Sequence, residues 1–516
     1  MFGIRVKGYS TMSARTGIRR AAILAASASL ALATAPIADA APALDGPALA
    51  KKLTKAVSAE GVNRHLIAFQ RIADRNAGNR SAGTSGYDAS VDYVAGKLRA
   101  AGFDVDTPTF TYPVQVTDAA TAKVGAASYE AIALTLSPQT PVGGITGPLR
   151  AVPQDATPGC EADDFAGQDF KGAVAVIRRG ACTFDIKHRN AAAAGAIGVI
   201  VANNIDGKLS GVTLGTPGVV PTGGVSKADG DKLFAAAGQS VTLDLRYHEE
   251  QKVSRNVIAT TKTGRRDNLV FAGAHLDSVA NGAGINDNGS GSAGLLETAL
   301  QLGSSPKLNN AVRFGWWGAE ELGLIGSTKY VQSLTFEQQL DIALYLNFDM
   351  IGSPNAAYFV YDGDNSDAVG EPAGPYGSAQ IEKAFVDYLT VEKKVQVEGT
   401  DFSGRSDYGE FIKHGIPAGG LFTGAEGIKT PEQVAKWGGT AGVAYDPNYH
   451  GKGDNLGNID RVALDRNADA LAWVTASYAI STESVNGVPA RAIRAKARAA
   501  SKSFHVEEHH THDATS

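Results

Sequence analysis

From about residue 256 onward, short runs of apolar residues alternate with longer stretches that have the pattern of helices. The apolar runs lie at 269–274, 311–317 and 343–348. Strands that are hydrophobic along their whole length, and that are joined by helices, are typical of parallel strands buried beneath helices. The alternation therefore predicts an α/β domain with a mostly parallel mixed sheet flanked by helices.

The regions before this domain have two different sequence patterns. Residues 50–102 are helical in pattern, and 85–101 places apolar side chains three and four residues apart before Gly102, a typical C-terminal cap. From about 110 to 248, short strands rich in Val, Thr and Ile are separated by Gly and Pro, with one Ala-rich helix at 184–194. Because the N-terminal helices have no sheet of their own, we assign them to the α/β domain and interpret the middle third as an insertion.

The first forty residues have the features of an export signal. Five basic side chains precede an uncharged apolar run at 21–35, and Ala38, Asp39 and Ala40 give the small-x-small pattern of a cleavage site. The alternative, a buried N-terminal helix, leaves the basic leader unexplained. The run is too short to span a bilayer, and no other apolar stretch of about 20 residues is present. We expect a secreted, soluble protein without a membrane partner.

Composition and cysteine usage agree with that expectation. The chain has 516 residues, of which 43% are hydrophobic and 20% charged, as in a globular protein. Without residues 1–40, 43 basic side chains face 52 acidic ones, which argues against nucleic acid as a partner. Cys160 and Cys182 are the only cysteines, and in an exported chain such a pair predicts a disulfide.

These observations predict five segments. Residues 481–516 hold Arg/Ala/Lys clusters and then four histidines, which indicates a disordered tail. The predicted order is a signal peptide (1–40), the first part of the α/β domain (41–112), the insertion (113–250), the second part of the α/β domain (251–480) and the tail (481–516).

Three of the predicted strands end in side chains that can bind a metal. His275 and Asp277 follow the first strand, Glu320 and Glu321 the second, and Asp349 the third. Because the carboxyl ends of strands in an open α/β sheet line the ligand crevice, these side chains should converge there. Histidine and carboxylate ligands together suit zinc better than calcium or magnesium.

Two further segments complete the candidate set. Asp287 lies in a Gly-rich turn before a predicted helix, and His450 lies in the loop 446–451. A single histidine is more often a structural residue than a ligand, but the whole set favours a metal site. If five ligands hold two ions, one carboxylate must bridge them, and the spare carboxylate is then available as a general base.

Several strings carry a resemblance to a known family. They are GAHLDSVANGAGINDNGSGSAG, FGWWGAEELGLIGS, YLNFDMIGSPN, GRSDYGEF, GGLFTGA and YDPNYH, in this order. They resemble the secreted two-zinc aminopeptidases of the Streptomyces type, over most of residues 60–105 and 250–480. The resemblance implies that His275 and Asp349 hold one zinc, that Glu321 and His450 hold the other, and that Asp287 bridges both.

The resemblance also implies roles for residues that are not ligands. Asp277 would orient His275, Glu320 would be the general base, and Tyr449 would donate a hydrogen bond to the oxyanion. A cis peptide is implied between Asp287 and Asn288. The implied pocket for the first side chain of the substrate comprises Met350 and Phe422, with Gly404 and Arg405 at its entrance. For Met350 and Phe422, simple core packing is the alternative.

The middle segment resembles a second family. The string CEADDFAGQDFKGAVAVIRRGACTFDIKHRNAAAAGAIGVIVANN is similar to a protease-associated domain, a non-catalytic module that usually lies near an active-site mouth. Both substrate gating and a passive stabilising insertion remain open for it.

Two departures from the aminopeptidase family bear on the metals. Asn448 and Gly453 stand where the Streptomyces relatives have a disulfide around the Tyr-His loop, so the second zinc is expected to bind more weakly. Asp465 and Asp469 match part of a calcium site in those relatives. Ala56 and Val57 stand where that site needs an acid, which argues against calcium.

The sequence thus predicts a monomeric, secreted two-zinc aminopeptidase that acts on N-termini of peptides or proteins and prefers large apolar side chains. Within the same fold, a carboxypeptidase or dipeptidase is an alternative, for which Arg405 is the one candidate to bind a free carboxylate. A single-zinc cyclase of N-terminal glutamine is a second alternative, and a non-catalytic binding protein is a third.

Overall fold

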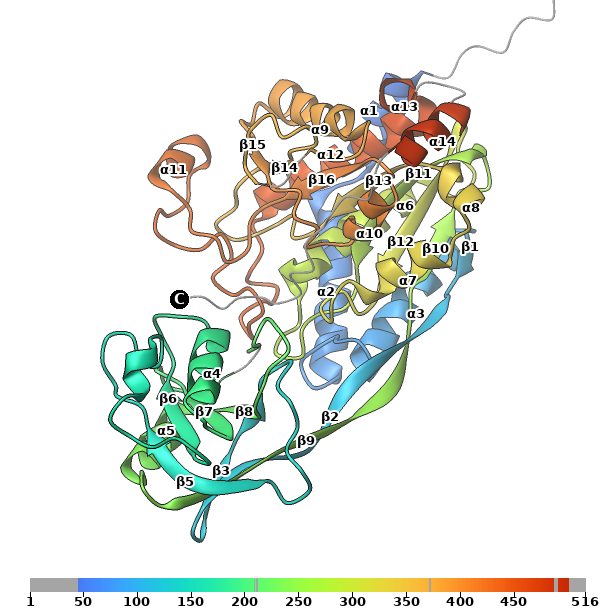
Figure 1. Ribbon diagram of the computed structural model, residues 1–516. Helices are drawn as coiled ribbons and strands as arrows, with labels where there is room; N and C mark the ends of the chain where they lie inside the picture. Colours follow the sequence, from blue (N-terminus) through green and yellow to red (C-terminus); the bar gives the residue numbers. More distant parts are fainter. Residues whose placement is uncertain (1–44, 208, 210–211, 371–372, 487–490, 501–516) are drawn as a thin grey trace, which may run out of the picture. The chain divides into compact units, whose positions relative to one another are not determined.

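The computed structural model describes residues 45–207, 209, 212–370, 373–486 and 491–500 (Figure 1). The predicted signal peptide, 1–40, and the end of the predicted tail, 501–516, lie outside the described residues. Within the described part of the chain, no helix is both long enough and apolar enough to cross a membrane.

The α/β domain is built on an eight-stranded mixed sheet. Its strands, in spatial order, are β1 (Asp104–Asp106), β10 (Val257–Thr260), β12 (Asn310–Trp317), β11 (Arg265–His275), β13 (Ile342–Phe348), β16 (Ala418–Phe422), β14 (Phe359–Tyr361) and β15 (Glu398–Thr400). The four central strands, β12, β11, β13 and β16, run parallel. The three strands predicted from apolar runs are therefore adjacent and share one direction, which confirms the predicted fold class.

Alternate residues of the central strands belong to two separate hydrophobic cores. Val270 of β11 and Leu344 of β13 belong to one core, whereas Phe271 and Tyr345, their neighbours in sequence, belong to the other. Both faces are thus covered by helices, as the continuous hydrophobicity of the strands requires. The first core takes side chains from α1 (Gly46–Ala56), α2 (Ala59–Arg75), α3 (Ser85–Ala100), α6 (Gly291–Leu302), α9 (Ser378–Asp387) and α12 (Arg461–Ile480). The second takes side chains from α7 (Ile325–Ser333) and α10 (Gly409–Lys413).

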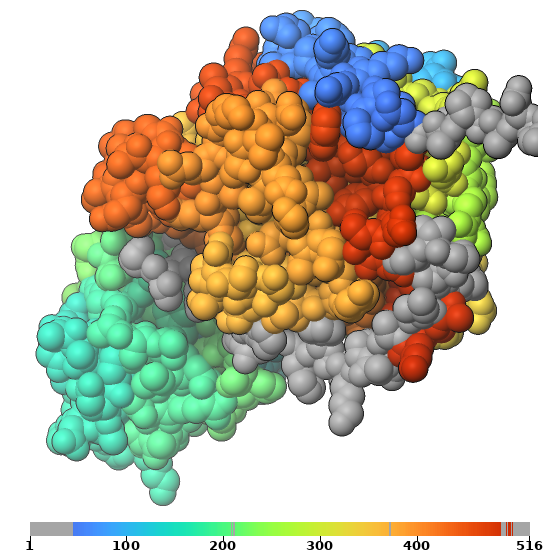
Figure 2. Space-filling view, turned by 90° about the horizontal axis from the view of Figure 1, so that it is seen from above, coloured from blue at the N-terminus to red at the C-terminus, as the bar shows by residue number. Residues whose placement is uncertain are grey.

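The N-terminal helices pack into the first core of this domain. Tyr87, Val91, Val94 and Leu98 of α3 are buried in the first core, and Gly102 ends the segment with φ +84°. In Figure 2 the blue N-terminal segment lies against the red C-terminal one, and the backbone N–H of Ala59 donates to Asp465 of α12 at 3.3 Å. The N-terminal and C-terminal segments of the α/β domain therefore contact each other.

A second sheet forms the inserted domain. Its spatial order is β3 (Ala127–Glu130), β2 (Thr109–Val124), β9 (Ser240–Arg255), β5 (Ile145–Ala151), β6 (Val174–Arg178), β7 (Gly198–Ala202), β8 (Thr222–Val225) and β4 (Ile132–Ala133). Alternate residues of β6 and β7 pack against α4 (Phe184–Ala193) on one face and α5 (Lys227–Ala235) on the other. The insertion thus has its own core.

A long two-stranded ribbon connects this insertion to the α/β domain. Strands β2 and β9 each have 16 residues and pair antiparallel from Thr109↔Arg255 to Val124↔Val241. The boundaries predicted at 112/113 and 250/251 fall inside these paired strands. The chain therefore enters and leaves the inserted domain through neighbouring residues.

The predicted disulfide is present between Cys160 and Cys182, with 5.9 Å between their Cα atoms. Replacing both cysteines by Ser is expected to lower the unfolding free energy of the inserted domain by roughly 3 kcal/mol. Without the disulfide, the unfolded segment between the two positions has more conformational freedom, which stabilises the unfolded state. Urea unfolding followed by a probe in that domain measures the change. Neither cysteine lies in the α/β domain, so loss of metal binding while that domain stayed folded would contradict the expected separation.

Two segments of the predicted disordered tail are helical. They are α13 (Glu483–Asn486) and α14 (Arg491–Ala500). Arg494 and Arg498 of α14 are buried and donate hydrogen bonds to the backbone carbonyls of Asp267 and Gln339, respectively. Arginines four residues apart lie on one helix face, so this face of α14 contacts the start of β11 and the helix α8 (Phe336–Asp341). The sequence pattern did not indicate these partners.

Candidate metal and catalytic site

The carboxyl ends of the three central strands bring the predicted ligands together. His275 is the last residue of β11 and pairs with Trp317 at the end of β12, and Asp349 directly follows β13. Glu320 and Glu321 follow β12 after a short turn that starts at Gly318. Because the strands are parallel neighbours, their ends meet at one edge of the sheet, as the sequence predicted.

Asp287 reaches the same place from the turn before α6. It lies in the helical turn η2 (Ile285–Ser290), and the peptide bond between Asp287 and Asn288 is cis, as the resemblance implies. The backbone N–H of Asp287 donates to Asp454 at 3.0 Å. The turn is buried throughout, so the position of the Asp287 carboxylate is set by its surroundings.

The five predicted ligands form two clusters that share Asp287. His275 Nε2 lies 3.3 Å from Asp287 Oδ1 and 3.3 Å from Asp349 Oδ1. His450 Nε2 lies 3.3 Å from Asp287 Oδ2 and 3.1 Å from Glu321 Oε2. Each cluster has one imidazole nitrogen and two carboxylates within 4.8 Å of one another. One oxygen of Asp287 faces each histidine, which is the arrangement that a bridging carboxylate needs.

The donor set fits zinc. Oε1 of Glu321 and Oδ1 of Asp349 are buried and have no hydrogen-bond donor among the described residues, and each belongs to one of the clusters. A buried carboxylate oxygen without a donor is costly unless a cation satisfies it. Two nitrogens from histidine and oxygens from carboxylates are ligands that zinc accepts.

The protonation equilibria show how crowded these acids are. Burial raises the pKa of Glu320 well above its usual value, and burial together with the charge of Asp287 raises the pKa of Glu321 to about 7. For Asp287 burial acts in the same direction, but hydrogen bonds with His275 and His450 hold its pKa below the usual range. Carboxylates packed this closely repel one another unless positive charge lies between them.

Asp277 holds the segment that carries both glutamates. Its carboxylate accepts hydrogen bonds from the backbone N–H groups of Glu320 and Glu321, at 3.1 and 3.4 Å. The same carboxylate lies 3.7 Å from His275 Nδ1, whereas the backbone carbonyl of Asp277 lies closer, at 3.3 Å. Asp277 therefore lies beside His275 and also fixes the turn after β12.

Glu320 lies beside the clusters but belongs to neither of them. Its Oε2 is 3.8 Å from His275 Nε2, and its side chain lines the pocket in front of the clusters. Tyr449 also lines this pocket, with its ring stacked on that of His450 at 3.9 Å between centroids. Burial raises the pKa of Tyr449 well above its usual value, so its hydroxyl keeps its proton.

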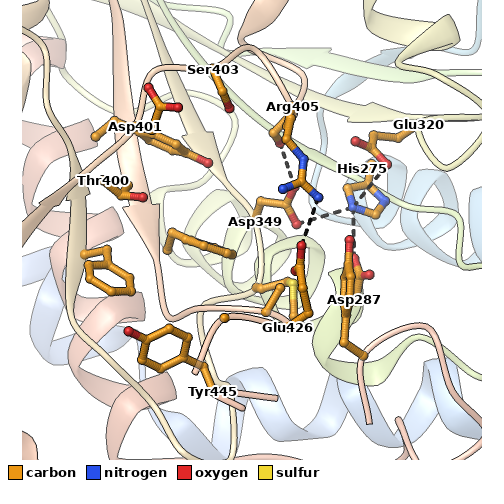
Figure 3. Close-up of a pocket in the computed structure, with 18 of the residues that line it drawn as sticks. His275, Asp287, Glu320, Asp349, Thr400, Asp401, Ser403, Arg405, Glu426 and Tyr445 are labelled. Atoms are coloured by element: carbon orange, nitrogen blue, oxygen red, sulfur yellow. Dashed lines mark hydrogen bonds and ion pairs between the residues drawn. The ribbon is translucent and has the colours of Figure 1, made fainter. Parts of the chain in front are cut away.

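A pocket of about 370 Å³ lies in front of the clusters. Figure 3 shows His275, Glu320 and Asp287 at one end and Thr400 and Asp401 at the other. Of the predicted pocket residues, Met350, Phe422 and Arg405 line the cavity. Gly404 is not among the lining residues, and its N–H donates to the Tyr408 hydroxyl at 2.8 Å. The aromatic lining also includes Phe359, Tyr361, Tyr408 and Tyr445, which sequence reasoning missed.

Ser406 is a further residue that the sequence did not single out. Its hydroxyl donates to Asp349 Oδ2 at 2.6 Å and accepts from Asn347 Nδ2 at 2.9 Å. The hydroxyl therefore orients one candidate ligand from the loop after β15. The only signal for it in the sequence is its place next to Arg405 in the string GRSDYGEF.

The two acids that match part of the family's calcium site, Asp465 and Asp469, have other partners in this structure. Lys393 Nζ forms an ion pair with Asp469, and Asp465 accepts the backbone N–H of Ala59. A lysine ammonium thus supplies a positive charge beside Asp469. The described contacts of this pair give no support for calcium.

Comparisons with known proteins agree with the fold and with the site. The sequence model of peptidase family M28 matches residues 256–475, and the PA domain model matches residues 145–233. A protein of Mycobacterium tuberculosis named "Probable lipoprotein aminopeptidase" is 49% identical over 463 residues, which cover 88% of this chain and 92% of the relative. An aminopeptidase of Pseudomonas aeruginosa is 45% identical over 84% of this chain and 83% of its own.

Solved structures show the same architecture. A zinc aminopeptidase from Bacillus subtilis superposes with a TM-score of 0.64 at 27% identity, covering 81% of this chain and 94% of that one. An aminopeptidase from Aneurinibacillus sp. strain AM-1 gives a TM-score of 0.58 at 29% identity, covering 82% and 95%. The metal-ligand clusters at the carboxyl edge of this sheet, together with the family model and these relatives, identify the chain as a metallopeptidase. The chain belongs to peptidase family M28, with a PA domain inserted in its α/β domain.

Proposed function

We propose that this chain, a zinc-dependent aminopeptidase of family M28, binds two zinc ions and uses Glu320 and Tyr449 to release the N-terminal residue of a peptide. The observation that carries the proposal is the pair of clusters that share Asp287, at one end of a pocket lined in part by aromatic side chains. His275 and Asp349 would hold one zinc, Glu321 and His450 the other, and Asp287 both. When bound there, zinc acts as a Lewis acid that polarises the scissile carbonyl and makes water more acidic.

Glu320 is placed to move the proton that the reaction requires. Its carboxylate takes a proton from the attacking water and returns it to the nitrogen of the leaving peptide. The backbone contacts of Asp277 hold Glu320 next to the clusters, so this carboxylate faces the pocket without being a ligand. The role matches the requirement that a general base lies within reach of the water and of the leaving group.

Tyr449 is placed to stabilise the tetrahedral oxyanion. Its hydroxyl remains protonated and lines the pocket next to His450. A hydrogen-bond donor fixed before the reaction stabilises the negative charge that develops on the carbonyl oxygen. The stacked ring of His450 restricts where this donor can move.

The pocket sets the proposed substrate preference. Met350, Phe359 and Phe422 give it apolar walls, and its volume of about 370 Å³ has room for a large side chain. Burying an apolar side chain against such walls stabilises the complex, so peptides with large apolar N-terminal residues are the proposed substrates.

The proposed substrate has a free amine, and acetylation tests this directly. Glu320 and Asp349 lie together at the cluster end of the pocket, where negative charge favours a protonated amine. Acetylating the substrate is therefore expected to abolish hydrolysis of a peptide such as Leu-Gly-Gly, measured by product release. If the acetylated peptide were cut as fast as the free one, an endopeptidase or a carboxypeptidase would replace the aminopeptidase. In the structure, Arg405, the candidate for binding a carboxylate, is paired with Glu426 at 3.3 Å.

We also propose that the protein is exported. The basic leader and apolar run within 1–40 support this, and so does the disulfide Cys160–Cys182, since such bonds persist in oxidising compartments. Sequencing the N-terminus of the protein recovered from culture medium tests the proposal. An N-terminus just after Ala40 is the expected result.

A further inference from the structure

Five polar side chains join the turn that carries Asp287 to the loop that carries Tyr449 and His450. We refer to them as the loop-bridging network, which consists of Asn286, Asp446, Asn448, Asp454 and Asn458. All but Asn448 are buried, with exposed fractions between 0% and 2%. None of the five is a candidate ligand, and none lines the pocket.

One side of the network holds the turn before α6. Asp454 accepts the backbone N–H groups of Asn286 and Asp287, at 2.7 and 3.0 Å, one from each carboxylate oxygen. The side-chain amide of Asn286 donates to Asp446 at 2.7 Å. The bridging carboxylate is therefore attached through its own backbone to a residue that follows His450 in the chain.

The other side of the network holds the loop with Tyr449 and His450. Asp446 accepts the backbone N–H of Asn448 at 2.9 Å, and the backbone carbonyl of Asp446 accepts the N–H of Tyr449 at 3.2 Å. The side-chain amide of Asn448 donates to Asn458 Oδ1 at 2.7 Å. The two residues directly before His450 are thus tied to the network.

Asn458 lies at the centre. Its amide nitrogen donates to both carboxylate oxygens of Asp446, at 3.0 and 2.9 Å, and to Asp454 at 3.2 Å. Without this amide, the buried carboxylates of Asp446 and Asp454 would lose the hydrogen-bond donor that they share. Removing a donor from a buried carboxylate costs more than an average hydrogen bond contributes, because the charge is left without a partner.

The network also occupies the position where a covalent closure would lie. A Cβ atom added to Gly453 would lie 1.9 Å from Asn448 Oδ1 and 3.1 Å from Asn448 Cβ. The amide of Asn448 therefore fills the space between the two arms of the loop. Hydrogen bonds through Asn458, in place of a covalent bond, connect the two arms of this loop.

We infer that Asn458 is a positioning residue that sets the separation of Asp287 from His450 and Tyr449. The inference rests on the proposed roles of these three residues. Through Asp454 it fixes the bridging carboxylate, and through Asp446 and Asn448 it fixes the loop that supplies the second histidine and the oxyanion donor. Its effect on the reaction is exerted wholly through these neighbours.

The first test compares two asparagines of the same loop. Asn458→Ala is expected to weaken zinc binding by about 10- to 100-fold and to lower kcat by a similar factor, as changes behind metal ligands commonly do. KM should change little, since Met350 and Phe422 lie on other segments. Asn455→Ala is the matched control, because Asn455 is exposed and, among the described residues, its side chain accepts only the N–H of Gly457 within its own turn. Zinc affinity is measured by calorimetric titration of the metal-free protein, independently of activity.

The second test restores the closure by another route. In the Asn458→Ala background, Asn448→Cys and Gly453→Cys together place two Cβ atoms 3.1 Å apart, so that a small outward shift of the loop reaches the roughly 3.5–4.5 Å typical of a disulfide. Oxidation is expected to recover most of the lost zinc affinity and kcat, and a thiol reductant should remove the gain. The Asn458→Ala variant with and without reductant controls for reduction of Cys160–Cys182.

The outcomes separate the inference from the proposed function. If Asn458→Ala melts at a lower temperature but keeps wild-type zinc affinity and kcat, the residue is merely structural and the inference is wrong. If it does not fold, Asn448→Ala, which removes a single bond from a partly exposed residue, must show the same losses in smaller degree. Failure of the proposed function would be seen already in the wild-type protein, as absence of zinc binding or of peptide hydrolysis.

Discussion

Glu320→Ala is expected to retain both zinc ions and to lower kcat by roughly 10²–10⁴-fold, the usual contribution of a positioned acid–base group. The adjacent change, Glu321→Ala, is expected to lower the zinc content. The two residues differ because Glu321 Oε2 lies 3.1 Å from His450 Nε2, whereas Glu320 is in neither cluster. Zinc analysis of the purified variants and steady-state kinetics with a leucine anilide measure both effects.

Glu320→Gln is the matched control for this pair. It keeps the shape of the side chain and removes only its ability to accept and return a proton, so its kcat should fall as in Glu320→Ala with little change in KM. If Glu320→Ala lost zinc and Glu321→Ala kept it, the two roles would have to be exchanged. Full activity in both variants would refute the assignment of the site.

Removal of metal is expected to abolish activity, and zinc should restore it to its full value only at two ions per chain. The expectation follows from the two clusters, each of which has three side chains once Asp287 is counted in both. The complementary test is the substitution Asp287→Ala. Since Asp287 is the one side chain common to both clusters, this change should weaken both sites at once, whereas His450→Ala should weaken one.

The measurement is a titration of the metal-free protein with zinc, followed in parallel by activity and by bound metal. Full activity at one ion per chain would reject the two-metal assignment. A loss of a single ion in Asp287→Ala would show that this carboxylate does not bridge, even though its two oxygens face different histidines in the structure.

The sequence predicted the part of the site that depends on strand ends. His275, Glu320, Glu321 and Asp349 lie where apolar runs stop, and parallel strands bring such positions to one edge whatever the details of the loops. The fold class followed from the same pattern. Asp287 and His450, which come from loops, could be named as candidates from the sequence, but their assignment to particular ions needed the resemblance to a family, because a loop sequence does not by itself state which strand end it approaches.

The residues that sequence reasoning missed act through partners far away along the chain. Ser406 bonds Asp349, 57 residues away, and Asp454 bonds the backbone of Asp287, 167 residues away. Such hydrogen bonds depend on tertiary packing, which produces no periodic pattern in the sequence. The same is true of α14. Its arginines have the sequence pattern of a solvated tail, but they donate hydrogen bonds to distant backbone carbonyls.

The ribbon of β2 and β9 has a consequence for the modularity of the chain. Because Thr111 lies opposite Val253, and the pairing continues outward from there, a short turn could join the strands at almost any rung without opening the core of the α/β domain. The inserted domain is in this sense a separable module, because its only strand connections to the α/β domain in the described part of the chain run through this ribbon. Exchange of that module between relatives would alter the surroundings of the enzyme while leaving the order of its strands and ligands intact.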